Sequence, residues 1–111
     1  MHLDITPEVL VAQLDLGHGE STLKQTQAAM ENTKNFEKFS KHIISLNDKL
    51  KHMNGYIALS NSHPCFKIKC ENKEEKIIKE FEEELAHWAS KYEVTLEKVD
   101  NKNVYYIIGR E

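Results

Sequence analysis

The segment His63-Pro64-Cys65 carries the residue types closest to catalytic chemistry in this chain. A histidine beside a cysteine can lower the pKa of the thiol and produce a reactive thiolate. Such a site also needs a group that orients the histidine and a donor for the developing oxyanion, and the flanking sequence identifies neither. An ordinary turn accounts for the same residues. We therefore expect no catalytic residues, and a small enzyme or metal-binding protein built around His63 and Cys65 stays an alternative.

The two cysteines and the six histidines are candidate metal ligands. In the alternating segment 65–70, Cys65 and Cys70 point to opposite faces and lie about 17 Å apart along a strand. A disulfide needs Cα atoms within about 7 Å, so we expect two reduced thiols, with Cys70 in the core. The histidines form no H-x-x-x-H pattern, and His18 between two glycines fits a helix stop. The sequence predicts no metal site and no cofactor.

A basic stripe is predicted on the segment 21–54, on the side away from its apolar residues. It consists of Lys34, Lys38, Lys41 and Lys49. Such a stripe could follow phosphates, or it could meet an acidic protein surface such as the Glu80, Glu83 and Glu84 side of the later helix. The net charge is −3 and Arg110 is the only arginine, so nucleic acid is possible but not favoured. The excess of lysine and asparagine also indicates an A/T-rich source genome.

Two adjacent tyrosines are the second candidate interaction site. Tyr105 and Tyr106 occupy consecutive strand positions and must point to opposite faces of a sheet. One of them is therefore exposed or part of an interface. Together with Lys67 and Lys69, an open sheet face with a tyrosine suits a protein partner or a ligand.

These residues must be positioned by one domain spanning 1–111. Residues 1–20 are expected to form a short strand and a short helix, 21–54 a long or kinked helix, and 55–111 a hairpin, a helix and a second hairpin. The pattern predicts an α+β fold, with a four-stranded and mainly antiparallel sheet from two hairpins and helices packed on one face. If residues 2–5 form a strand, the alternative is a ferredoxin-like plait with an added strand.

The stretch 21–53 contains no glycine and no proline, and its second half has an apolar stripe at helical spacing. One helix of this length would be roughly 50 Å long, and a domain of this size has a radius of gyration of about 13 Å. Either the helix is kinked near 32–35, or a second copy covers the overhang. The sequence thus predicts self-association as a homodimer, with another protein as the alternative partner.

Compartment and function class follow from what the sequence does not contain. No apolar run of about 18 residues is present, and the N-terminus has no export signal, so we expect no membrane association and a cytoplasmic location. No nucleophile, base and metal-ligand set converges in the sequence. The expectation is a small cytoplasmic protein-interaction or adaptor module without catalytic activity, with a nucleic-acid-binding protein using Lys34, Lys38 and Lys41 as the alternative.

Overall fold

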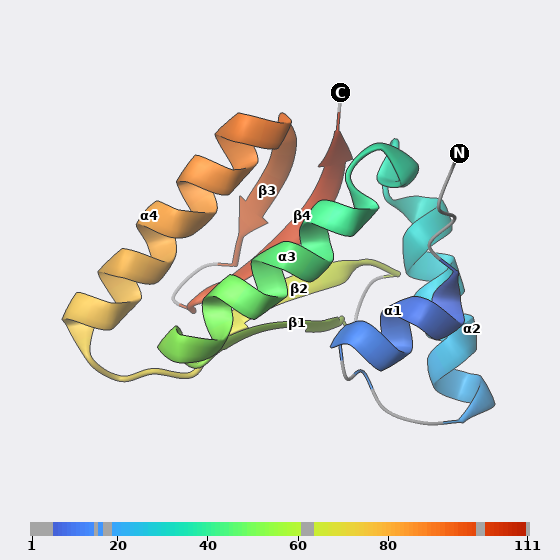
Figure 1. The fold of residues 1–111 in the computed structure, drawn as a ribbon, viewed down its shortest axis with the longest axis horizontal. Helices are drawn as coiled ribbons and strands as arrows, with labels where there is room; N and C mark the ends of the chain where they lie inside the picture. The colour runs from blue at the N-terminus through green and yellow to red at the C-terminus, as the bar shows by residue number, and fades with distance from the viewer. Residues whose placement is uncertain (1–5, 15, 17–18, 61–63, 100–101, 111) are drawn as a thin grey trace.

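The computed structural model describes residues 6–14, 16, 19–60, 64–99 and 102–110. Figure 1 shows the arrangement of its helices and strands. Along the chain they are α1 (Pro7–Leu14), α2 (Glu20–Asn32), the 3-10 turn η1 (Phe36–Lys38), α3 (Ser40–Leu50), the 3-10 turn η2 (Lys51–Met53), β1 (Gly55–Leu59), β2 (Phe66–Cys70), α4 (Glu75–Tyr92), β3 (Val94–Lys98) and β4 (Val104–Arg110).

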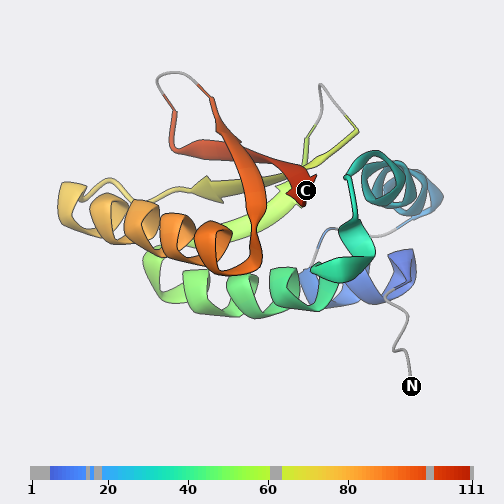
Figure 2. The same cartoon turned by 90° about the horizontal axis from the view of Figure 1, so that it is seen from above.

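The strands form one antiparallel sheet in the order β1-β2-β4-β3. Helices α3 and α4 lie side by side on one face of it, and α2 stands beside the sheet (Figures 1 and 2). The predicted α+β fold with two hairpins is therefore confirmed. The strand that the plait alternative needs, at residues 2–5, falls outside the described part of the chain.

The face under α3 and α4, here called the inner face, carries the core. In β2 the side chains of Phe66 and Ile68 are fully buried, whereas Lys67 and Lys69, which alternate with them, are only partly covered. This is the predicted register. Phe81, Leu85 and Trp88 of α4 are also buried, as expected from their helical spacing.

The stretch 21–53 does not form one helix, because α2 ends at Asn32. Thr33 is extended and Asn35 is left-handed with φ 54°, and both residue types are poor helix formers. Between them, Lys34 leaves the helix and bonds to β4: its carbonyl oxygen accepts the N–H of Arg110 at 2.9 Å. Gly109, at φ 144°, has no side chain to block this approach, since a Cβ there would lie 2.7 Å from Lys34.

The break folds the apolar stripe into the chain's own core. Six residues of the stripe are each no more than 4% exposed: Phe36, Phe39, Ile43, Leu46, Leu50 and Met53. The radius of gyration is 13.3 Å and the longest extent is 37 Å, so the described helices include no rod of roughly 50 Å. The kink near 32–35 is the correct alternative, and this stripe is not available to a second copy.

Side chains bond to the backbone just before α4 and at the start of α1. The first helical residue of α4 is Glu75. The Asn72 Oδ1 accepts the N–H of Glu74 at 2.9 Å, which makes an Asx turn just before the helix. At α1 the Thr6 hydroxyl caps the helix, because it accepts the Val9 N–H at 3.2 Å.

Candidate functional site

The lysines of the expected stripe lie on separate elements. Lys34 lies in the break and Lys38 in η1, and Lys41 and Lys49 are exposed near the two ends of α3. Because the helix is interrupted, the four positions no longer share the face of one helix. This finding does not test whether the four lysines bind a partner, but they do not form one stripe on one helix.

The basic and acidic helices meet within one chain. Lys49 and His52 line the same surface hollow as three glutamates of α4, namely Glu80, Glu83 and Glu84. These glutamates were the acidic surface that the sequence suggested as a counterpart for the lysines. The basic and acidic side chains therefore lie near each other within one molecule.

The two tyrosines of β4 separate as their alternation requires. Tyr105 pairs with Ile68 and faces inward, with its ring centroid 6.2 Å from that of Phe81. Burial, and then the charge of Glu82, raise the pKa of the Tyr105 hydroxyl above 10.0. Tyr106 pairs with Lys67 and Glu97 and lies on the opposite side of the sheet. Of the pair, Tyr106 is therefore the candidate for an interface.

That opposite side, here called the outer face, is left uncovered by α3 and α4 (Figure 2). Strand alternation assigns to it Tyr56, Ala58, Lys67, Lys69, Glu97, Val104 and Tyr106. Ile108 is 44% exposed, but it lies at the register shift between β3 and β4, where alternation assigns no face. Apolar, aromatic and charged groups thus share one accessible sheet surface, a composition typical of an interaction site.

The centre of the outer face is a row of paired residues across neighbouring strands. Lys67 of β2 lies directly opposite Tyr106 of β4, and Glu97 of β3 lies opposite the same tyrosine on its other side. Across the three strands, the row therefore consists of a positive charge, an aromatic ring and a negative charge. Sequence reasoning had found Lys67 and Tyr106 but not Glu97, because only the β3–β4 register places the glutamate in this row.

A second row of the outer face is internally compensated. Lys69 lies 3.7 Å from the Glu71 carboxylate, which also accepts a hydrogen bond from the Tyr56 hydroxyl at 2.9 Å. Burial, the hydrogen bond and the charge of Glu71 raise the pKa of Tyr56 above 10.0. These three side chains therefore hold one another in place, and the central row offers the clearer charges to a partner.

A hollow of about 420 Å³ opens on the outer face beside the turn between β3 and β4. Its lining combines three lysines with an aromatic ring and apolar side chains: Lys67, Lys69, Lys102, Tyr106, Val99 and Val104. Cations around a ring can receive a carboxylate or a phosphate attached to an apolar or aromatic group.

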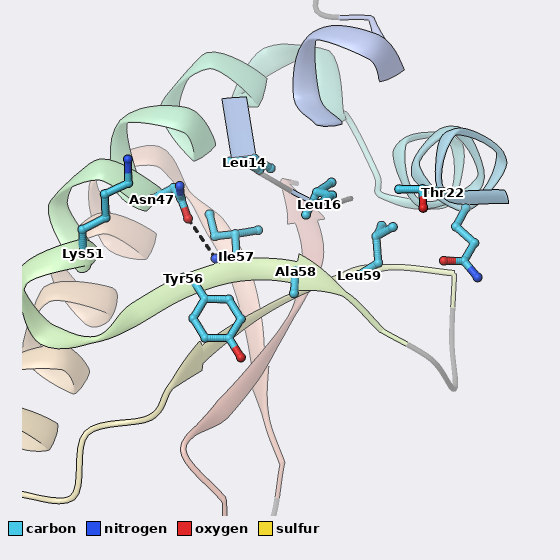
Figure 3. Close-up of a pocket in the computed structure, with 10 residues that line it drawn as sticks. Leu14, Leu16, Thr22, Asn47, Lys51, Tyr56, Ile57, Ala58 and Leu59 are labelled. Atoms are coloured by element: carbon cyan, nitrogen blue, oxygen red, sulfur yellow. Dashed lines mark hydrogen bonds between the residues drawn. The ribbon is translucent and has the colours of Figure 1, made fainter. Parts of the chain in front are cut away.

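A different pocket, of about 400 Å³, lies against the free edge of β1. Figure 3 shows Leu14, Leu16 and Leu59 on one side of this strand and the Tyr56 ring on the other. The buried Asn47 of α3 reaches the edge, where its Oδ1 accepts the Ile57 N–H at 3.0 Å. The edge is thus partly closed by its own chain, a common protection against unwanted strand pairing.

The cysteines behave as structural residues. Both are free and buried; Cys70 is the last residue of β2 and lies in the core as predicted, whereas Cys65 precedes the strand. Burial is the largest influence on Cys65 and raises the pKa of its thiol above the ordinary 9.0, against a smaller lowering by its hydrogen bond with Ser60. A raised pKa disfavours the thiolate that a nucleophile needs. His63 and His18 lie outside the described residues.

His42 is a titratable group that the sequence did not single out. Its ring stacks on Tyr92 of α4 with centroids 3.9 Å apart, and its carbonyl oxygen accepts the Trp88 indole N–H at 3.2 Å. Burial, followed by the charges of Lys41, Lys91 and Arg110, lowers the pKa of His42 below 6.5. The α3–α4 contact therefore favours a neutral histidine.

Comparisons with protein-family models, curated proteins and solved structures find no match for this chain. Within the described ranges, no three or more His, Cys, Asp or Glu side chains are grouped so as to hold a metal ion. None of the helices in those ranges combines the length and apolar character needed to cross a bilayer.

Proposed function

We propose that the protein is a small protein-interaction module without catalytic activity, and that it binds its partner through the outer face. The observation that carries this proposal is the row of Lys67, Tyr106 and Glu97 at the centre of an uncovered sheet. A tyrosine contributes a large apolar contact with a polar tip, and the flanking charges fix the orientation of the partner. This combination supports binding more directly than chemistry.

The environment of the cysteines supports a non-catalytic role in a reducing compartment. Cys65 is buried with a raised thiol pKa, so its surroundings oppose nucleophilic activation. Cys65 and Cys70 are both free, as thiols generally are in the cytoplasm. We propose that the module is cytoplasmic, and we favour self-association over a different protein partner.

A second candidate function, binding of single-stranded nucleic acid, is supported by the hollow beside Tyr106. Exposed aromatic rings on a sheet stack on bases, and neighbouring lysines contact phosphates. Lys67, Lys69 and Lys102 surround this ring. Against this candidate, Glu97 lies beside the same ring and Glu71 pairs with Lys69. Both carboxylates would repel a phosphate backbone.

Amide NMR of the ¹⁵N-labelled protein distinguishes these functions. The labelled protein is titrated separately with unlabelled protein, with a polyglutamate peptide and with oligothymidylate. Shifts confined to the outer face in either of the first two titrations support a protein-interaction module, and such shifts with oligothymidylate alone support the second candidate. Shifts on α3 and α4, or none in any titration, contradict the proposal.

A pair of charge reversals makes the test specific to the face. Lys67→Glu lies in the central row, whereas Lys76→Glu changes an exposed lysine on α4, away from the outer face. The first substitution is expected to abolish the shifts, and the second to leave them unchanged. Equal loss in both variants would show that net charge, and not the outer face, controls binding.

A further inference from the structure

We propose that the partner is a second copy of this chain, packed outer face to outer face about a two-fold axis parallel to β4. This inference rests on the proposed function, since it names the partner of the same face. Opposite charges lie on the two sides of β4. A two-fold rotation about an axis along this strand places each charge over the opposite charge of the other copy.

The central row fixes where the charges lie relative to β4. Lys67 on β2 and Glu97 on β3 both pair with Tyr106, so they lie at the same level along the strand. Each is one strand spacing, about 4.8 Å, from the tyrosine. The lysine and the glutamate therefore lie at equal distances on opposite sides of β4, and their charges are opposite.

A two-fold rotation about an axis along β4 exchanges the two sides of the strand. It therefore places Lys67 of each copy over Glu97 of the other, and Tyr106 over Tyr106. The two unlike-charge contacts are related by the symmetry and form together. An isologous dimer needs such a self-complementary surface.

The other face-to-face arrangement is disfavoured by the same charges. A two-fold axis perpendicular to the strands would place Lys67 over Lys67 and Glu97 over Glu97. Like charges brought together in an interface oppose association. The charge pattern therefore selects one of the two symmetric ways to stack the sheets.

Apolar groups lie where the axis requires them. Alternation places Val104 and Tyr106 along the outer side of β4, opposite Lys69 and Lys67 of β2. In the dimer these side chains lie next to the axis and pack against their own copies. Because sheets stack with strands inclined by about 30°, the ridges cross at a small angle and do not align atom on atom.

The dimer is expected to be weak. Four strands spaced by about 4.8 Å, each of about five residues, offer a projected area of roughly 300 Å². A standard interface covers about 800 Å² on each partner. We therefore expect a reversible dimer with a dissociation constant of micromolar order or higher.

Sedimentation equilibrium of two single charge reversals tests the arrangement. Lys67→Glu and Glu97→Lys each create two like-charge contacts in a homodimer, so each is expected to weaken dimerisation by at least roughly tenfold. An equimolar mixture of the two variants restores both unlike pairs in a heterodimer. The mixture is therefore expected to reach the average mass of the unchanged protein, while each variant alone stays monomeric.

Mixing separates contacts between copies from effects within one chain. In the mixture no chain carries both reversals, so the restored mass cannot arise from a rebuilt pair inside one chain. Each variant's unfolding midpoint in urea serves as its control for folding. If either reversal unfolds the chain, Lys67→Gln and Glu97→Gln replace the reversals, with weaker dimerisation expected for each.

Each outcome of these measurements either supports or contradicts the proposed dimer. Restoration in the mixture, and weakening of the unchanged dimer by added salt, support the arrangement, because salt screens the attractive pairs. A monomeric mass for the unchanged protein at high micromolar concentration overturns the arrangement. A mixture of the two variants that stays monomeric, under conditions where the unchanged protein is dimeric, overturns it as well. The polyglutamate titration can still succeed in either case, so this failure is distinct from failure of the proposed function.

Discussion

The two faces of the sheet are built from alternate residues of the same strands, and they differ in what those residues contact. On the inner face Phe66 is fully buried and stacks on Phe36, with ring centroids 5.3 Å apart. One residue further, Lys67 faces outward in a row with Tyr106 and Glu97. Neighbours in sequence therefore differ in environment: one side of each strand contributes to the core, and the other is the side that we propose binds a partner.

The largest expected effect comes from truncating the inner face. Phe66→Ala removes a fully buried ring and is expected to lower the free energy of unfolding by about 3–5 kcal/mol. Lys67→Ala, one residue away, is the matched control and is expected to change it by less than about 0.5 kcal/mol. Urea denaturation of both variants measures the difference. Similar losses in both would contradict the separation of the two faces.

A smaller effect tests how the helical layer is attached to the sheet at the end of β4. Gly109→Ala forces a side chain onto the Lys34 backbone and strains a positive φ, so we expect a loss of about 1–3 kcal/mol. Gly19→Ala is the control, because Gly19 also has a positive φ but nothing within 4 Å of its added Cβ. If the two variants are equally destabilised, the contact with Lys34 contributes nothing beyond backbone strain.

A third prediction concerns pH and the α3–α4 contact. Because the pKa of His42 is lower in the folded chain, the unfolded chain binds the proton more readily. The contribution of His42 to stability is therefore intact above pH 6.5, and it decreases as the pH falls through 6.5 towards the folded value. His42→Gln should show a shallower loss of unfolding free energy between pH 7.5 and 5.5, and identical slopes would contradict the assignment.

Local patterns predicted the fold well because strand alternation and helical spacing depend on near neighbours. They placed Phe66 inward and Lys67 outward correctly. The sequence left open whether 21–53 is one helix or is kinked, because its apolar stripe is regular, while the decisive contact, Lys34 with Gly109, joins residues far apart in sequence. For the same reason the sequence identified Tyr106 as a candidate without its neighbour Glu97, since the pairing of β3 with β4 is not a local property.

The central claim is that the outer face binds without contributing to the stability of the fold. Tyr106→Glu tests it most directly when unfolding free energy and sedimentation mass are measured on the same sample. The account predicts a free energy of unfolding within about 1 kcal/mol of the unchanged protein, together with a monomeric mass at concentrations where the unchanged protein is dimeric. A large loss of stability, or an unchanged dimer, would contradict it.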